Sequence, residues 1–227
     1  MEDLQQAGLQ PVEEISQVPP GETVLLRTHG VGPAVQEEAR RRGLRVIDAT
    51  CPFVARAQRE AARLQQAGYQ VLVLGEPDHP EAQAIREHTG GLATIVEAPK
   101  HLETLSLSPR VAVVCQTTQR LDALRELVSA LLPRVAELLI ANTICDATTQ
   151  RQEAAVRMAR EVDVVIVIGG HHSANTTRLA QICADAGKPT YHVESAEEIQ
   201  CEWLRGVERV GITAGASTPP EAIEAAV

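Results

Sequence analysis

Short apolar runs, each closed by a polar turn and followed by an amphipathic stretch, recur along the whole chain. The runs are rich in Val, Ile and Leu, as buried strands are, and the stretches between them have helical spacing. Strands are expected at residues 11–15, 23–27, 46–47, 71–74, 94–96, 111–114, 164–168, 189–193 and 210–213. Helices are expected over 1–8, 34–42, 52–64, 80–87, 121–132 and 176–186, with a short final helix after residue 220. This alternation predicts an α/β fold with parallel sheets and right-handed crossovers.

One passage of this pattern occurs twice. Asp48-Ala49-Thr50-Cys51 leads into a helix that begins at Pro52, and Cys145-Asp146-Ala147-Thr148 leads into another, with Gln-Arg and Glu-Ala-Ala sequences following in both. We expect two Asp-Ala-Thr turns that carry one cysteine each. A duplicated architecture with its chemistry in equivalent turns is therefore predicted.

Composition limits the possible partners and the compartment. The net charge of -9 argues against nucleic acid or a membrane surface as partner, because basic patches hold both. No run is apolar over the length of a membrane span, and Met1-Glu2-Asp3-Leu4 is not a secretory signal, so we expect a cytoplasmic protein with a small-molecule ligand. Five cysteines without a CxxC motif indicate reduced thiols or metal ligands and not a disulfide framework.

The residue types suited to chemistry gather where the expected strands end, which is where parallel sheets bind ligands. They are His29, Cys51, His79, Glu81, Thr117, Thr118, Cys145, Ser173, Asn175 and Ser217. His29 and His79 could be turn histidines or ligands of an anion. The 173–176 segment could be a simple N-cap or a phosphate site, and Glu81 could favour only its own helix or act as a proton donor.

The five cysteines differ in the roles that are expected for them. Cys183, within an expected helix, and Cys201 are interpreted as small buried hydrophobes. Cys51 and Cys145 fit either that role or a shared metal or cluster site, because their surroundings match. Cys115 lies beside a polar turn, and its role stays open.

Seven segments of the chain, in order, resemble the LytB-type 4-hydroxy-3-methylbut-2-enyl diphosphate reductases, which are iron–sulfur enzymes of the methylerythritol phosphate route to isoprenoids. The segments are Thr-His-Gly-Val at 28–31, Asp-Ala-Thr-Cys-Pro at 48–52, His-Pro-Glu at 79–81, Gln-Thr-Thr at 116–118, Ile-Cys-Asp-Ala-Thr-Thr-Gln-Arg-Gln-Glu at 144–153, Ser-Ala-Asn-Thr at 173–176 and Thr-Ala-Gly-Ala-Ser-Thr-Pro at 213–219. Together they span essentially the whole chain.

The resemblance implies a trefoil of three small parallel-sheet α/β domains around a central [4Fe–4S] cluster, here 1–50, 51–142 and 143–227 with the first incomplete. It implies that Cys51 and Cys145 are cluster ligands. His29, His79, Ser173, Asn175 and Ser217 would hold the diphosphate, while Glu81 and Thr117 would relay a proton. Two electrons from a ferredoxin or flavodoxin would then convert the substrate to isopentenyl and dimethylallyl diphosphate.

The chain also departs from the family pattern. Members begin with a strand ending in Gly-Phe-Cys-x-Gly-Val, which supplies another cluster cysteine, and carry one more diphosphate histidine soon after it; the 227 residues begin beyond both. Ala174 stands where some members have a second serine. We therefore expect a truncated reductase whose cluster is impaired, with Cys115 as a substitute ligand only if its geometry suits. The alternatives are a diphosphate-binding remnant without catalysis, and a zinc- or iron-dependent hydrolase that uses His29, His79 and Glu81.

Overall fold

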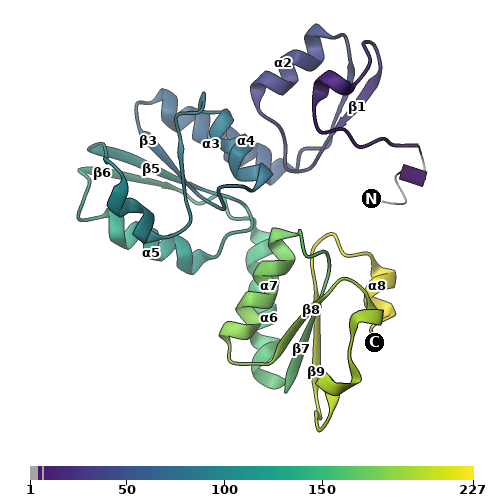
Figure 1. Ribbon diagram of the computed structural model, residues 1–227. Coiled ribbons are helices and arrows are strands. Elements are labelled where there is room, and N and C mark those ends of the chain that lie inside the picture. The colour runs from purple at the N-terminus through teal and green to yellow at the C-terminus, as the bar shows by residue number, and fades with distance from the viewer. Residues whose placement is uncertain (1–4, 7) are drawn as a thin grey trace. The chain divides into compact units, whose positions relative to one another are not determined.

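The computed structural model describes residues 5–6 and 8–227, and it confirms an α/β fold built on parallel sheets (Figure 1). The helix expected over residues 1–8 lies largely outside the described residues. The described strands form a two-stranded sheet, a four-stranded sheet and a three-stranded sheet, and every pair of neighbouring strands is parallel. Among the described residues, no helix has both the length and the apolar composition that a membrane span requires.

The elements follow the expected order along the chain. The strands are β1 (Thr23–Leu26), β2 (Arg45–Asp48), β3 (Gln70–Leu74), β4 (Thr94–Val96), β5 (Arg110–Cys115), β6 (Glu137–Ala141), β7 (Val164–Ile168), β8 (Thr190–Val193) and β9 (Val210–Ala214). The α-helices are α2 (Pro33–Arg41), α3 (Pro52–Gln66), α4 (Pro80–Glu87), α5 (Leu121–Leu131), α6 (Asp146–Glu161), α7 (Ala174–Asp185) and α8 (Pro220–Glu224). Short 3-10 helices are η1 (Ile15–Gln17), η2 (Pro99–Thr104), η3 (Ala196–Glu198) and η4 (Cys201–Leu204).

The chain divides into two compact units. The first unit contains residues 1–117 and 122–143, and the second contains 118–121 and 144–227. The first unit thus holds both the two-stranded and the four-stranded sheet, and the second holds the three-stranded sheet. The division into three domains stays a prediction.

The β1–β2 sheet is covered on one face only. Val24 packs with Ala39 of α2 and with Val18 and Leu44 from the flanking loops. On the other face Leu25 and Ile47, which are paired in the sheet register, are 45% and 49% exposed. Alternation along a strand places its odd and even residues on opposite faces, so the exposed pair marks a face without a covering helix among the described residues.

The four-stranded sheet, in the order β4-β3-β5-β6, has its core between strands and helices. Alternate residues of β3 and β5 pack against Ala57, Ala61 and Leu64 of α3 and against Ile85 of α4. Helix α5, whose Leu127 is fully buried, lies on the opposite face (Figure 1). Fully buried strands of this kind read as unbroken apolar runs, which is why the sequence predicts them well.

The three-stranded sheet of the second unit, in the order β8-β7-β9, is covered on both faces (Figure 1). One face of β7 packs with α6 and α7 through residues such as Ala159 and Leu179. The other face packs against Trp203 and Ala222, which belong to η4 and α8. Each sheet therefore leaves its strand ends free to carry polar turns.

Two expectations about local structure are wrong, and one strand was not predicted. Residues 11–15 do not form a strand; Ile15–Gln17 is a 3-10 helix, because the Gln17 side chain accepts hydrogen bonds from the backbone N–H groups of Glu13 and Glu14. The sequence analysis did not identify β6, an edge strand that is only partly buried. The second Asp-Ala-Thr sequence is not a turn, since α6 begins at Asp146 itself.

Candidate functional site

The chemistry-bearing residues lie just beyond the carboxyl ends of the strands, as expected. His29 follows β1, Cys51 follows β2, and His79 and Glu81 follow β3. Thr117 follows β5, Cys145 follows β6, Ser173 and Asn175 follow β7, and Ser217 follows β9. His29, Cys51, His79, Glu81 and Thr117 belong to the first unit, and Cys145, Ser173, Asn175 and Ser217 belong to the second.

A buried carboxyl–hydroxyl pair, Glu81 and Thr117, lies in the first unit. Glu81 is 2% exposed at the start of α4, and both of its carboxylate oxygens accept hydrogen bonds from Thr117. One oxygen accepts from the backbone N–H of Thr117 at 2.5 Å, and the other from its hydroxyl at 3.0 Å. The pair joins the end of β5 to the start of α4, which follows the neighbouring strand β3.

Burial raises the pKa of Glu81 to about 7, because a carboxylate loses its hydration there. The two hydrogen bonds from Thr117 lower this pKa, and the nearby charge of Glu76 raises it. Burial is the largest effect, so the carboxyl group titrates near neutral pH. A carboxyl group with such a pKa can both hold and release a proton under physiological conditions.

Two histidines stand beside this acid. The rings of His29 and His79 meet edge to face with their centroids 5.1 Å apart, and His79 Nδ1 accepts a hydrogen bond from the Glu81 backbone N–H at 3.1 Å. Burial lowers the pKa of both imidazoles, and Arg27 lowers it further in each. His79 also lowers the pKa of His29, while Glu76 partly offsets the shift at His79. The structure thus joins His29, His79, Glu81 and Thr117 in one line of contacts.

Cys51 and Cys145 occupy the same position in their helices. Each is the N-cap residue, of α3 and of α6, and each is partly exposed with a free thiol. The backbone carbonyl of Cys51 accepts from Ala55 and that of Cys145 from Thr149, so the first helical turn starts at the cysteine. The N–H groups of a first helical turn favour a negatively charged group in front of them.

The other three cysteines differ from these two. Cys115 and Cys183 are fully buried, and burial raises the pKa of the Cys115 thiol to about 12 and that of Cys183 to about 11. Cys183 is therefore a buried hydrophobe, as expected. Cys201 is not, because it begins η4 on the surface and is exposed. The buried interior of β5 makes Cys115 a poor metal ligand, since a ligand must be deprotonated.

The second unit offers neutral hydrogen-bonding groups. Ser173 caps α7 by accepting from the Thr176 backbone N–H at 3.4 Å. Both amide atoms of Asn175 and the hydroxyl of Thr176 are shielded from solvent and have no hydrogen-bond partner among the described residues. Ser217 is exposed in the turn after β9, and the neighbouring Thr218 hydroxyl donates to the Ile168 carbonyl at 2.9 Å. The start of α7 thus has polar groups to offer a ligand.

Sequence reasoning missed several residues that shape these groups. Arg27 acts on both histidines, and the Thr143 hydroxyl donates to the Cys115 carbonyl at 2.6 Å, closing the turn after β6. Gln116 is fully buried, and its side-chain oxygen accepts from the Glu76 N–H at 2.9 Å. Their position next to strand ends was the available signal. Among the described residues no group of three or more His, Cys, Asp or Glu side chains is arranged to hold a metal ion, so the hydrolase alternative gains no support.

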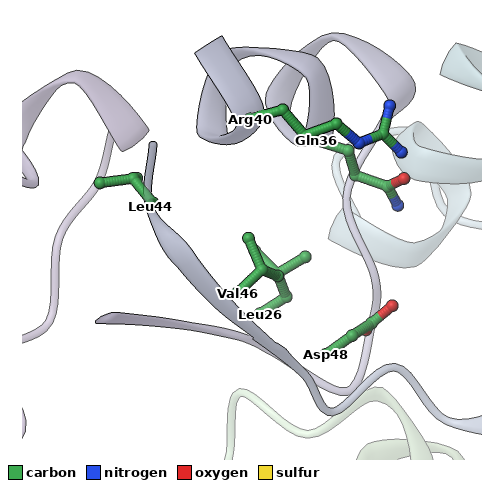
Figure 2. Close-up of a pocket in the computed structure, with 6 residues that line it drawn as sticks. All are labelled: Leu26, Gln36, Arg40, Leu44, Val46 and Asp48. Carbon is green, nitrogen blue, oxygen red and sulfur yellow. The ribbon is translucent and has the colours of Figure 1, made fainter. Parts of the chain in front are cut away.

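A hollow of about 350 Å³ lies between α2 and the β1–β2 sheet (Figure 2). It is lined by Leu26, Gln36, Arg40, Leu44, Val46 and Asp48. None of the candidate site residues lines it. The hollow is thus separate from the strand-end groups described above.

Comparison with known proteins gives one consistent result. A sequence profile described as "LytB protein" matches residues 1–227. The 4-hydroxy-3-methylbut-2-enyl diphosphate reductase of Citrifermentans bemidjiense is 47% identical over 216 residues, which cover 95% of this chain and 76% of the relative. The protein of the same name from Geobacter sulfurreducens is 46% identical with the same coverage. The chain therefore spans about three quarters of the length of these relatives.

Solved structures agree with the sequence comparison. The E-1-hydroxy-2-methyl-but-2-enyl-4-diphosphate reductase from Plasmodium falciparum matches with a TM-score of 0.92 at 26% identity, over 98% of this chain and 71% of that one. A solved structure of (E)-4-hydroxy-3-methyl-but-2-enyl diphosphate reductase, the terminal enzyme of the non-mevalonate pathway, matches with a TM-score of 0.69 at 41% identity. It covers 99% of this chain and 81% of that one.

Proposed function

The chain belongs to the LytB protein family, and from this premise we propose that it is built for the reductive dehydroxylation of 4-hydroxy-3-methylbut-2-enyl diphosphate. In this reaction the allylic C–O bond breaks and the oxygen leaves as water. Two electrons and two protons are consumed, and the carbon skeleton becomes isopentenyl or dimethylallyl diphosphate. The named relatives are reductases of this diphosphate, which supports the assignment.

The observation that carries the proposal is the Glu81–Thr117 pair. Loss of a hydroxyl as water requires a proton at the departing oxygen, and a buried carboxyl group with a pKa of about 7 can supply it near neutral pH. The Thr117 hydroxyl, 3.0 Å from a Glu81 oxygen, can pass that proton on. We assign Glu81 as the acid and Thr117 as its relay.

The diphosphate is assigned to the neutral groups. His29 and His79 are partly buried imidazoles with lowered pKa values, so an arriving anion can draw a proton onto them. Ser173, Asn175 and Ser217 supply hydroxyl and amide donors at the start of α7 and in the turn after β9. The unpartnered amide of Asn175 supports a ligand role, because a shielded amide otherwise has an unmet hydrogen bond.

Cys51 and Cys145 would hold the [4Fe–4S] cluster that the family resemblance implies. Their partly exposed thiols at helix N-caps fit thiolate ligation, whereas the buried Cys115 does not. When bound, such a cluster supplies the two electrons one at a time. The 227 residues thus contain two of the cysteines that the resemblance assigns to the cluster. The cytoplasmic location and a ferredoxin or flavodoxin donor stay predictions.

The test is anaerobic reconstitution of the full 227-residue chain with iron and sulfide, followed by reaction with 4-hydroxy-3-methylbut-2-enyl diphosphate and a chemical one-electron reductant. We expect bound iron with acid-labile sulfide and formation of both isoprenyl diphosphates. Pyrophosphate binding without any cluster would favour the non-catalytic diphosphate-binding remnant. Bound zinc without sulfide, together with release of phosphate, would contradict the proposal.

A further inference from the structure

The two cysteine-bearing helices are reached by equivalent routes. Strands β1 and β5 each pair in parallel with the strand that follows them, β2 and β6. After β2 the chain crosses the end of β1, where the Cys51 N–H donates to the Thr28 carbonyl at 3.0 Å. After β6 it crosses the end of β5, where the Thr143 hydroxyl donates to the Cys115 carbonyl. Each crossing then leads to an N-cap cysteine.

A glutamine stands seven residues after each of these cysteines. Gln58 lies on α3 and Gln152 on α6, and seven residues are about two helical turns, so each glutamine is on the same side of its helix as its cysteine. Gln58 is 4% exposed and Gln152 is 9% exposed. Buried glutamines are uncommon because the amide must be desolvated. Because two buried glutamines occupy the same position of a duplicated passage, we expect them to share one role.

Gln58 packs against the turn that follows β1. Its amide nitrogen takes the space that a side chain at Gly30 would need, so a Cβ there would clash with it. Gly30 also has a φ of +70°, which glycine adopts without strain. The Thr50 methyl lies on the same side. The Gln58 nitrogen is shielded from solvent and has no hydrogen-bond partner among the described residues. The amide therefore fills the corner between the His29 turn and the Cys51 turn.

Gln152 contacts the turn that follows β5. Its side-chain nitrogen donates to the Thr118 carbonyl at 3.4 Å, and Thr118 directly follows Thr117 in the chain. Each glutamine thus reaches from a cysteine helix to the turn after the first strand of the equivalent pair, β1 or β5. One of these turns carries His29 and the other carries Thr117.

We propose that Gln58 and Gln152 are a matched pair of positioning residues, Gln58 for the His29 turn and Gln152 for the Thr117 turn. The roles of His29 and Thr117 rest on the proposed function, but the contacts do not. Each amide contacts the residue that directly follows the functional one in the chain, Gly30 after His29 and Thr118 after Thr117, and so fixes the turn that carries it. A purely structural glutamine would affect stability and leave the titration of these side chains as it was.

The test is to titrate His29 and Glu81 by NMR in the unliganded full chain, comparing wild type with Gln58→Leu and Gln152→Leu. In Gln152→Leu we expect the pKa of Glu81 to rise by about half a unit or more, because the Thr117 bonds that lower it loosen. In Gln58→Leu we expect the pKa of His29 to return toward its ordinary value as its turn opens to water. Neighbouring charges, Glu76 for Glu81 and Arg27 and His79 for His29, stay in place.

Specificity is the decisive feature of this test. Gln152→Leu should change the pKa of Glu81 and not that of His29, and Gln58→Leu should do the reverse. The control variants Gln66→Leu and Gln150→Leu, at exposed positions of the same two helices, should change neither pKa. If a leucine variant does not fold, Gln58→Asn or Gln152→Asn retains the amide with a shorter reach, and the same shift is expected. Folded variants with wild-type titrations, or equal shifts at both groups, would overturn the proposal. A wild-type chain without a cluster would defeat the proposed function alone, because these titrations use no cluster.

Discussion

The strand-end groups of the two units share one feature and differ in another. Both units present a partly exposed cysteine at a helix N-cap. The first unit adds titratable side chains whose pKa values are shifted by burial, namely His29, His79 and Glu81. The second unit adds neutral hydroxyl and amide groups, of which the Asn175 amide and the Thr176 hydroxyl have no hydrogen-bond partner among the described residues.

This difference indicates a different chemical role for each unit. Glu81, whose pKa is about 7, is suited to moving a proton, whereas neutral donors at a helix start are suited to holding an anion. We therefore expect substitutions in the first unit to change rates and pH dependence. Substitutions in the second unit should change affinity with little effect of pH.

The largest effect is expected from Glu81→Gln. The amide keeps the size of the side chain, and its oxygen can still accept from the Thr117 N–H while its NH2 donates to the Thr117 hydroxyl oxygen. It cannot donate the acid proton, so kcat for dehydroxylation should fall by about 10² to 10⁴ relative to the turnover of the unmodified chain. Pyrophosphate affinity should be nearly unchanged. Glu87→Gln, at an exposed position of the same helix, is the control. A kcat within about twofold of wild type would remove Glu81 from the mechanism.

The raised pKa of Glu81 should also make the folding stability depend on pH. In the folded chain the pKa of Glu81 is about 7, above its ordinary value of 4.5, so the folded state holds the proton that the unfolded state releases between these values. The contribution is present below pH 4.5 and is lost as pH rises through about 7. The loss is on the order of 3 kcal/mol. Urea unfolding at several pH values across this range gives the free energy of unfolding of wild type and of Glu81→Gln. The free energy should fall with pH in wild type more steeply than in Glu81→Gln. An equal dependence on pH in both would show that the pKa of Glu81 is not raised.

A smaller, pH-independent effect is expected in the second unit. Asn175→Ala removes an amide that has no protein partner, so folding stability should hold while the Kd for inorganic pyrophosphate rises about tenfold at every pH from 6 to 8. Gln181→Ala, farther along α7, is the control. Calorimetric titration measures both. A loss of affinity that varies with pH would break the distinction between the units.

Pyrophosphate binding at His29 and His79, unlike the effect of Asn175→Ala, should depend on pH. Because an anion draws protons onto His29 and His79, pyrophosphate binding should take up protons and tighten as pH falls from 8 to 6. The change should be severalfold and should largely disappear in His79→Ala. Titrations in two buffers of different ionisation enthalpy detect the proton uptake. Affinity that is flat with pH in wild type would contradict this role.

The smallest effect is expected from the buried cysteines. Cys115→Ala and Cys183→Ala remove thiols that are protonated at neutral pH, so reconstituted iron content should be unchanged. Each change leaves only a small cavity and should lower Tm by a few degrees. Thermal unfolding with iron analysis checks both. Loss of iron in Cys115→Ala would show that this cysteine is a ligand.

Periodicity in the sequence predicted most of the fold because the strands are fully buried apolar runs, such as β7, and the helices have clear starts, such as Pro52 and Pro80. Periodicity did not predict segments whose backbone conformation or burial depends on particular side-chain contacts. Gln17 turns an apparent strand into a 3-10 helix, and β6 is too exposed at the sheet edge to be recognised.

Strand ends could be predicted as the place of the candidate site, but not the contacts there. Glu81 and Thr117 are 36 residues apart, and their pairing follows from the register of β3 with β5, which periodicity does not give. The exposure of Cys201 depends in the same way on how η4 packs. The family resemblance named the residues, and the structure supplies the burial and the hydrogen bonds that give Glu81 its pKa.

We propose that Cys51 and Cys145, and not the other cysteines, hold an iron–sulfur cluster. The most direct measurement is iron and acid-labile sulfide per chain after anaerobic reconstitution of wild type, Cys51→Ser, Cys145→Ser and Cys115→Ala. We predict that Cys115→Ala retains the wild-type content and that each serine variant loses nearly all of it. Serine variants with as much iron and sulfide as wild type would contradict the account.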